Sequence, residues 1–296
     1  MVRVRVPATT ANFGPGFDCI GAAMGLYNYI DMEFSSSTEV IVSGEGEMEI
    51  SRDETNLVYR AARRVFDEVG IDRPVKITLE NNIPIARGLG SSAACIGGGM
   101  MAANRLAGDL LSFEKILNMA AEMEGHPDNV VPALIGGFTL SLKCGPRVIY
   151  KSFCIPCELR FVVGIPNFHL KTEDARRVLP KTVDFEDAVF NIGRAALLVA
   201  AVSKGDFLDL NIFCQDRLHQ PYRSALIPGM EEIIKIAPEK GALACFLSGA
   251  GPAVVSIAFQ NRAEELGKDM VGIFKEKGIE ADYKVIPPSN EGIKIY

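Results

Sequence analysis

The spacing of apolar side chains changes several times along the first half of the chain. Val2, Val4 and Val6 alternate with arginines, which is typical of a strand with one buried face. Between residues 56 and 69 the apolar positions recur at helical spacing and a glycine follows, so we expect an amphipathic helix there. The other segments follow the same reasoning: strands at 23–34, 38–43, 75–79 and 134–142, and helices at 91–107 and 112–124.

A second set of elements begins near residue 158. Its order is β-α-β-β-α-β with one additional helix, which is typical of the ferredoxin-like arrangement. We therefore predict an α+β protein of two domains, residues 1–155 and 156–296. The elements expected in the second domain are strands at 159–165, 242–247, 253–259 and 281–286, and helices at 185–203, 206–219 and 261–277.

Composition narrows the class of protein. The chain has 296 residues, 48% of them hydrophobic, which is enough for a sizeable core. Its net charge of −6 argues against a broad basic face for nucleic acid. No apolar run approaches the roughly 20 residues of a membrane span, and the N-terminus lacks the apolar core of a signal peptide. The seven cysteines are irregularly spaced and read as reduced thiols, so we expect a cytoplasmic protein with no membrane partner.

A glycine-rich turn is the first candidate for chemistry. Residues 88–94 read Gly-Leu-Gly-Ser-Ser-Ala-Ala, at the point where a loop after a predicted strand becomes a helix. The N-terminus of a helix offers unpaired N–H groups and about half a positive charge, which suit a phosphate group. The common phosphate-loop motif with its lysine is absent. Glycine turns also form where a helix and a strand merely pack closely, so the glycines alone leave both interpretations open.

Three longer segments together point to a family. Residues 84–94, which include this turn, resemble the ATP-binding motif of the GHMP small-molecule kinases. Residues 7–18 resemble the N-terminal motif of the homoserine kinases within that family, with Thr10 and Phe13 where Ser and Leu are more usual. Residues 247–252, Leu-Ser-Gly-Ala-Gly-Pro, resemble its C-terminal glycine motif. The resemblance implies a two-domain GHMP kinase fold, with an N-terminal domain like ribosomal protein S5 and a C-terminal ferredoxin-like domain.

The resemblance also implies which residues hold ATP. Backbone N–H groups of the turn would bind its phosphates, and Asn56 would lie beside the adenine, although a helix-starting role explains Asn56 equally well. The implied nucleotide-binding residues are Asn56, Pro84, Arg87, Gly88, Leu89, Gly90, Ser91, Ser92, Ala93 and Ala94.

A carboxylate at an unfavourable place suggests a cation. Glu124 ends a predicted helix, where the helix dipole disfavours a negative charge by up to about 1 kcal/mol. The resemblance implies that Glu124 and Ser92 hold Mg²⁺, which suits a site of one or two protein oxygens completed by phosphate and water. The alternatives are an exposed glutamate at a helix end, or Glu122 as the ligand in its place.

The residues implied for the acceptor lie in both predicted domains. Asp18 would receive an ammonium group, and the arginines would receive a carboxylate through their planar forks. Turn-stabilising roles for the side chains of the glycine-proline loop, and surface positions for the arginines, are the alternatives. The implied substrate-binding residues are Asn12, Asp18, His126, Asn129, Thr172, Arg176, Arg223 and Gly249.

The activity that the resemblance implies is transfer of the γ-phosphoryl group of ATP to the side-chain hydroxyl of L-homoserine, giving O-phospho-L-homoserine and ADP in threonine biosynthesis. Ser92, Glu124 and Asn129 would be the catalytic residues. Asn129 stands where mevalonate kinases carry an aspartate, so we expect catalysis without a dedicated base. Another GHMP kinase acting on mevalonate or shikimate, or a silent ligand-binding regulator, are the alternatives. The apolar strand at 253–259 suggests a homodimer surface.

Overall fold

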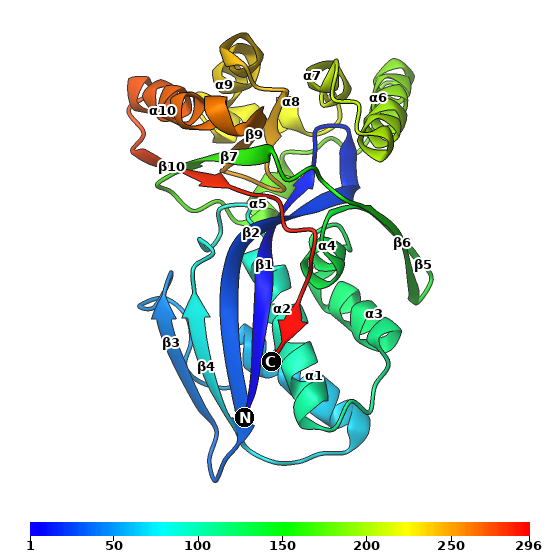
Figure 1. Ribbon diagram of the computed structural model, residues 1–296, viewed down its shortest axis with the longest axis vertical. Helices are drawn as coiled ribbons and strands as arrows, with labels where there is room; N and C mark the ends of the chain where they lie inside the picture. The colour runs from blue at the N-terminus through cyan, green and yellow to red at the C-terminus, as the bar shows by residue number, and fades with distance from the viewer.

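The computed structural model describes all 296 residues, and its chain forms two sheets (Figure 1). The larger sheet has seven strands in the order β11-β1-β2-β4-β3, and β5 pairs with β2 and with β6. Both predicted N-terminal strands are longer than expected, since they continue through the motif at residues 7–18. The strands are β1 (Val2–Asn12), β2 (Gly16–Phe34), β3 (Glu39–Gly44), β4 (Val75–Asn81), β5 (Phe138–Cys144), β6 (Arg147–Phe153) and β11 (Lys294–Ile295).

Four helices pack on one side of this sheet: α1 (Leu57–Val69), α2 (Ser91–Leu106), α3 (Phe113–Glu124) and α4 (Val130–Ile135) (Figure 1). Helix α1 forms where predicted because Asn56 caps its first turn and Gly70 closes it in the left-handed conformation. Its apolar stripe, which includes Val65 and Phe66, is fully buried, mainly against α2, and Phe66 also contacts Phe34 of β2. The predicted helices at 91–107 and 112–124 are also confirmed.

The smaller sheet has four antiparallel strands in the order β10-β7-β9-β8. This order confirms the ferredoxin-like arrangement expected from the element order. The strands are β7 (Leu159–Pro166), β8 (Ala244–Leu247), β9 (Val254–Phe259) and β10 (Ala281–Ile286). The helical elements of this half are α5 (Thr172–Arg177), α6 (Phe185–Lys204), α7 (Leu210–Phe213), α8 (Gln220–Arg223), η1 (Ser224–Leu226), α9 (Met230–Ile236), η2 (Ala237–Lys240) and α10 (Gln260–Glu276).

Two predicted elements are wrong. The strand expected at 134–142 begins as the end of helix α4, and the strand β5 starts only at Phe138, after two glycines with positive φ. An unbroken apolar run carries no period, so it does not distinguish a buried helix from a buried strand. The helix expected at 206–219 is reduced to the single turn α7. Asp216 then accepts backbone N–H groups of residues 218–220, which fixes a capped turn before α8.

The expected dimer surface is also wrong. Strand β9 lies between β7 and β8, and its residues 254–258 are buried. These apolar side chains therefore form the core of the second sheet and are not available to a partner.

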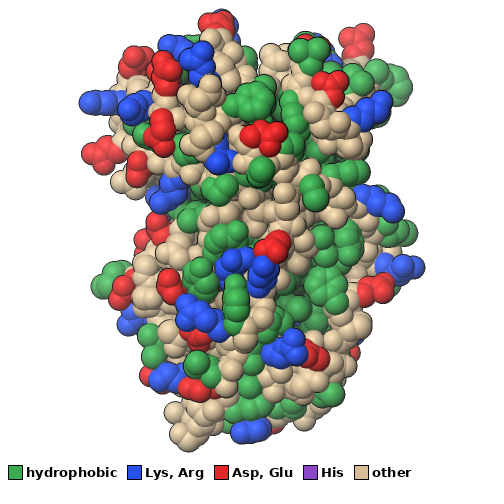
Figure 2. Space-filling model, in the orientation of Figure 1, with side chains coloured by type: hydrophobic (Ala, Val, Ile, Leu, Met, Phe, Trp, Pro, Cys, Tyr) green, Lys and Arg blue, Asp and Glu red, His purple; other side chains and the backbone are tan.

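The end of the chain returns to the first sheet. After β10 the backbone crosses back, and Ile295 pairs with Val4 of β1 (Figure 1). The division into residues 1–155 and 156–296 stays a prediction, but these last residues lie with the first sheet. In the space-filling view, acidic and basic side chains alternate over both halves of the visible face (Figure 2). None of the helices combines the length and the apolar character that a membrane crossing requires.

Candidate active site

A cleft of about 380 Å³ lies where the two halves of the chain meet. It is lined by the loop before α2, the end of α3, the turn between β1 and β2, helix α5, Arg223 of α8 and the loop after β8. Residues predicted from three separate motifs are thus brought together. The predicted residues that line the cleft are Asn12, Asp18, Asn56, Pro84, Arg87, Gly88, Leu89, Gly90, Ser91, Ser92, Glu124, His126, Asn129, Thr172, Arg176, Arg223 and Gly249.

The glycine turn is shaped by close backbone contacts. Gly88 and Gly90 both have positive φ, at 78° and 70°. A Cβ on Gly88 would lie 2.2 Å from the carbonyl oxygen of Ser248, and one on Gly90 would lie 1.8 Å from Oγ1 of Thr9. Only glycine fits these positions without displacing a neighbour. The turn leads directly into α2, and Gly90 is the N-cap of that helix.

The C-terminal glycine motif braces this turn from the other half of the chain. The Ser248 hydroxyl donates to the carbonyl of Gly88 over 2.6 Å and accepts from the Thr10 hydroxyl at 2.8 Å. The Ala253 N–H donates to the carbonyl of Arg87. Two of the three motifs thus form one rigid unit, and the start of α2 stays directed into the cleft.

Two predicted phosphate-binding residues do not line the cleft. Ala93 and Ala94 lie in the first turn of α2, and their side chains are buried in the core. The Ala94 N–H already donates to the carbonyl of Gly90, because it closes the first helical turn. Its inclusion among the phosphate donors is therefore wrong. The N–H groups of Ser91, Ser92 and Ala93 are the first three of the helix, which have no partner within it.

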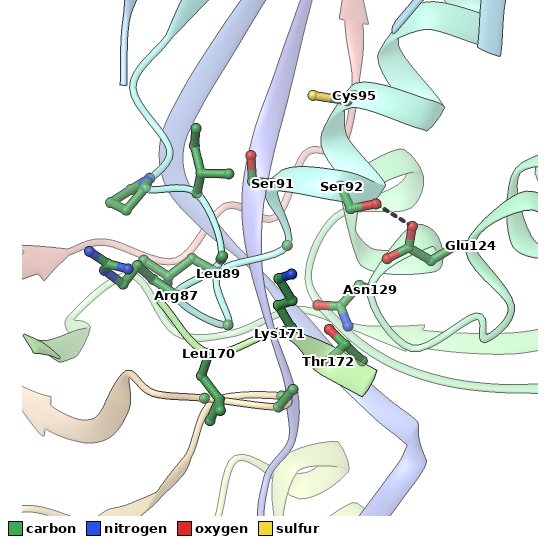
Figure 3. Close-up of a pocket in the computed structure, with 18 of the residues that line it drawn as sticks. Arg87, Leu89, Ser91, Ser92, Cys95, Glu124, Asn129, Leu170, Lys171 and Thr172 are labelled. Atoms are coloured by element: carbon green, nitrogen blue, oxygen red, sulfur yellow. Dashed lines mark hydrogen bonds between the residues drawn. The ribbon is translucent and has the colours of Figure 1, made fainter. Parts of the chain in front are cut away.

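Ser92 and Glu124 face each other at the N-terminal end of α2 (Figure 3). The Ser92 hydroxyl donates to Oε2 of Glu124 over 2.7 Å. Burial raises the pKa of Glu124, although the Ser92 hydrogen bond opposes this. Glu122 instead points outward and forms an ion pair with Arg64. A desolvated carboxylate thus lies beside a hydroxyl and the helix N-terminus, while the neighbouring glutamate is on the surface.

A polar chain holds Asn129 in one orientation. The Thr9 hydroxyl donates to Oδ1 of Asn129 over 2.8 Å, and the Asn129 amide nitrogen donates to Asp128 over 3.3 Å. Nδ1 of His126 lies 2.7 Å from the same carboxylate oxygen of Asp128. Burial by itself would lower the pKa of His126, but the hydrogen bond and charge of Asp128, with smaller contributions from other carboxylates, raise it.

Opposite charges meet at the other end of the cleft. Arg176 donates two hydrogen bonds to the carboxylate of Asp18, over 3.0 and 2.7 Å. The two side chains are 36% and 34% exposed, so the pair remains accessible from the cleft. The hydrogen bonds to Asp18 raise the pKa of Arg176, which keeps it charged. Thr172 and Arg176 lie four residues apart on helix α5.

Asn12 and Gly249 join the two halves of the chain at this end. The side-chain oxygen of Asn12 accepts from the Asp18 N–H, and its amide nitrogen donates to the carbonyl of Gly249 over 3.0 Å. Arg223 is only 1% exposed, and its Nη1 donates to the same carbonyl over 3.0 Å. Burial lowers the pKa of Arg223 to about 10, with the charge of Arg176 acting in the same direction, so it remains cationic at neutral pH.

The end of the cleft nearest α1 is apolar. Asn56 caps α1 by accepting the Val58 N–H, which confirms the helix-starting role, and its adenine contact stays a prediction. Burial raises the pKa of the Cys95 thiol to about 12, so this cysteine is inert. Sequence reasoning missed the apolar lining because those residues belong to ordinary core patterns: Ile50, Leu57, Val58, Leu79 and Ile85.

Other missed residues are polar or aromatic neighbours of predicted ones. Thr9 and Phe17 lie inside the motif at residues 7–18, and Asp128 lies between the predicted residues His126 and Asn129, so their positions were the available signal. Lys171 precedes Thr172 and projects into the cleft near Asn129 (Figure 3). Nothing in its local sequence distinguishes it from a surface lysine.

Comparison with known proteins matches both halves of the chain. The family model "GHMP kinases N terminal domain" matches residues 56–137, and "GHMP kinases C terminal" matches residues 198–274. A homoserine kinase of Moorella thermoacetica is 48% identical over 99% of both chains. A homoserine kinase of Desulfitobacterium hafniense is 42% identical over all of both chains.

Solved structures agree with the sequence comparison. A homoserine kinase from Cytophaga hutchinsonii superposes with a TM-score of 0.89 at 31% identity, covering 100% of this chain and 97% of that one. A mevalonate kinase from L. major, at 16% identity and a TM-score of 0.69, shares the fold. These matches confirm the predicted two-domain α+β fold. The chain belongs to the GHMP kinase family, and its full-length relatives in that family are homoserine kinases.

Proposed function

We propose that this chain is a homoserine kinase, which transfers the γ-phosphoryl group of ATP to the side-chain hydroxyl of L-homoserine. The relatives that match its whole length support this activity. The observation that carries it in the structure is the pair of Asp18 and Arg176 in the same cleft as the glycine turn. An α-amino acid carries one ammonium and one carboxylate, and this pair offers one group of each opposite charge.

Binding of the amino acid would exchange this internal pair for two external ones. The substrate ammonium would contact Asp18, and its carboxylate would contact Arg176 and Arg223. This exchange favours binding because it increases the number of ion contacts and leaves no charged group unpaired. Mevalonate and shikimate have a carboxylate but no ammonium, so they would leave Asp18 without a cationic partner once Arg176 turned to the ligand.

The phosphates would lie at the start of α2. The unpaired N–H groups of Ser91 and Ser92 and the positive end of the helix dipole would bind their oxygens. The adenine would occupy the apolar end beside Asn56 and Leu57. The amino acid and the nucleotide would then approach each other near Asn129, at the junction of the two halves of the cleft.

Mg²⁺ belongs to this proposal, with Ser92 and Glu124 as the residues that would hold it. The structure contains no group of three or more His, Cys, Asp or Glu side chains arranged for a metal. This donor set still fits Mg²⁺, which commonly takes one or two protein oxygens and completes its shell with phosphate and water. The half-buried Glu124 carboxylate next to the start of α2 meets that requirement. When bound, Mg²⁺ would neutralise charge on the transferred phosphate.

The reaction would proceed without a dedicated base. The homoserine oxygen forms a bond to the γ-phosphorus, the bond from that phosphorus to the bridging oxygen of ADP breaks, and the hydroxyl proton leaves late to a phosphate oxygen. Asn129 is an amide and cannot take this proton. His126 is held to Asp128 by one nitrogen, and the raised pKa that results lowers the share of neutral imidazole able to accept the proton. These residues would orient the hydroxyl instead.

A panel of acceptors tests the activity. With coupled detection of ADP, L-homoserine should exceed mevalonate, shikimate and galactose by orders of magnitude in kcat/KM. Equal or better turnover of any of these three would overturn the assignment. If no acceptor is turned over while ATP or homoserine still binds by calorimetry, the chain would be a ligand-binding regulator.

A homodimer and a cytoplasmic location complete the proposal. Phe185, Val189 and Ile192 form an exposed stripe on α6, at 84%, 55% and 69% exposure. Their spacing of four and three residues is typical of a helix–helix seam. Antiparallel packing of α6 on a second copy would place Phe185 of each copy against Ile192 of the other. Light scattering should give twice the chain mass, and Ile192→Lys should halve it; equal masses at the monomer value would overturn the dimer.

A further inference from the structure

A buried histidine lies beneath the amino-acid end of the cleft. His219 is 1% exposed and precedes helix α8, four residues before Arg223. It does not line the cleft, and no motif in the sequence contains it. Its ring packs beside Phe17, which does line the cleft, at 5.1 Å between ring centroids.

Both ring nitrogens of His219 have partners that belong to the substrate region. Nε2 lies 2.7 Å from the carbonyl oxygen of Gly14, in the turn between Asn12 and Asp18. Nδ1 lies 3.3 Å from Nη1 of Arg223. A guanidinium can only donate, so Nδ1 must accept, and the ring proton must then be on Nε2 and point to the Gly14 carbonyl. One neutral tautomer satisfies both contacts.

The surrounding backbone keeps the ring in place. Asp216 accepts the N–H groups of His219 and Gln220 over 3.0 and 2.6 Å. Asn191 donates to Asp216 over 2.7 Å and to the carbonyl of Pro15 over 3.4 Å. His219 and Asn191 thus bind adjacent carbonyls of the same turn. Burial lowers the pKa of His219, in keeping with the neutral tautomer that the contacts require.

Arg223 is left with one nitrogen for a ligand. Its Nε donates to the carbonyl of Ala175 over 3.0 Å, and its Nη1 is shared between Gly249 and His219. Nη2 takes part in none of these contacts, and the residue lines the cleft. The three internal contacts therefore fix the plane of the guanidinium and determine where Nη2 points.

We propose that His219 is a positioning residue that aligns Arg223 and the turn at residues 12–18 for the two ends of an amino-acid substrate. The proposal rests on the proposed homoserine kinase activity. It acts through two hydrogen bonds of one ring: the contact at Nδ1 orients the carboxylate-binding arginine, and the contact at Nε2 holds the turn that carries Asp18. His219 itself touches neither the substrate nor the nucleotide.

A double-mutant cycle tests this role. We would measure the KM of homoserine, the KM of ATP and kcat for the full chain and for His219→Leu, Arg223→Leu and the double variant. His219→Leu should raise the homoserine KM by about tenfold or more, the loss expected when a hydrogen bond to a charged binding group is removed. The ATP KM should change less than about twofold. In the Arg223→Leu background, His219→Leu should add little, since the group it orients is gone.

Controls separate this role from a general loss of structure. His219→Gln can keep one of the two hydrogen bonds and should fall between the parent and His219→Leu, which also provides a readout if the leucine variant does not fold. Met270→Ala removes a buried side chain from the core of the second sheet, away from the cleft, and should leave both KM values unchanged.

Two outcomes would overturn the inference: effects of His219→Leu and Arg223→Leu that multiply in the double variant, or parallel changes in the two KM values. Failure of the proposed function would look different. In that case the unmodified chain would neither phosphorylate homoserine nor bind it by calorimetry, before any variant is compared.

Discussion

Replacing Glu124 with Gln should lower the activity of this protein strongly while changing its thermal stability little. Glu124 ends α3, so its charge opposes the helix dipole, and its burial raises its pKa. The substitution keeps the size of the side chain and its ability to accept the Ser92 hydrogen bond. It removes only the negative charge, which is the property that a metal ligand needs.

The structure sets the size of the two effects. Relief of the dipole repulsion should favour the variant by about 0.3–1 kcal/mol, and the weaker hydrogen bond from Ser92 should cost about 1 kcal/mol. These contributions oppose each other, so the Tm should stay within about 4 °C of the parent. Loss of the charge that would hold Mg²⁺ should lower kcat by about 10²-fold or more, because a bound metal contributes several kcal/mol to the transition state.

The pH dependence of stability gives an independent check. The pKa of Glu124 is raised in the folded protein, so its protonated form contributes stability at low pH, and this contribution is lost as pH rises through the folded-state pKa. Gln has no such dependence. The Tm of Glu124→Gln relative to the parent should therefore increase as the pH rises above about 4.

Thermal unfolding and steady-state kinetics with saturating homoserine measure both effects. The matched control is Glu122→Gln, which changes an exposed glutamate two residues away that is paired with Arg64. This control should keep kcat within about twofold. The reasoning would be refuted if the two variants lost the same activity, or if Glu124→Gln lost activity only in proportion to a large fall in Tm.

Further predictions concern the acceptor, the glycine turn and the base. Arg176→Leu should raise the homoserine KM and leave the ATP KM nearly unchanged, and a matching loss of ATP affinity would place this arginine at the nucleotide. Gly88→Ala should lower stability by about 1–3 kcal/mol more than Gly145→Ala in thermal unfolding, since both have positive φ but only the former meets Ser248; equal losses would refute the clash. His126→Gln, assayed at saturating homoserine from pH 6 to 9, should lower kcat by less than the factor of about 10²–10⁴ that a base contributes; a larger loss that abolishes an ionisation would identify His126 as the base.

Local chemistry was enough to predict part of this architecture. The helix α1 follows from its apolar spacing together with Asn56 and Gly70, because cap, stripe and terminator agree within one short segment. The ferredoxin-like sheet follows from the order of its elements. The glycine turn could be predicted because the residues of the family motif are the same glycines that the close backbone contacts of the turn require.

The remaining features depend on contacts between distant segments. The pairing of Asp18 with Arg176 joins residues 158 positions apart, and neither residue's neighbours indicate that it binds the other in the absence of substrate. His219 resembles any histidine in a turn until the fold brings Gly14 to one ring nitrogen and Arg223 to the other. The helix expected at 206–219 failed because the Asp216 side chain offers the backbone a capped turn in place of a continued helix.

The most direct test of the proposed activity is to identify the phosphorylated product. The chain would be incubated with L-homoserine, ATP and Mg²⁺, and the mixture followed by phosphorus NMR and mass spectrometry. We predict one phosphomonoester on the side-chain oxygen of homoserine for each ADP formed. ADP released without a homoserine ester, or a phosphoryl group on any other acceptor in preference to homoserine, would contradict the account.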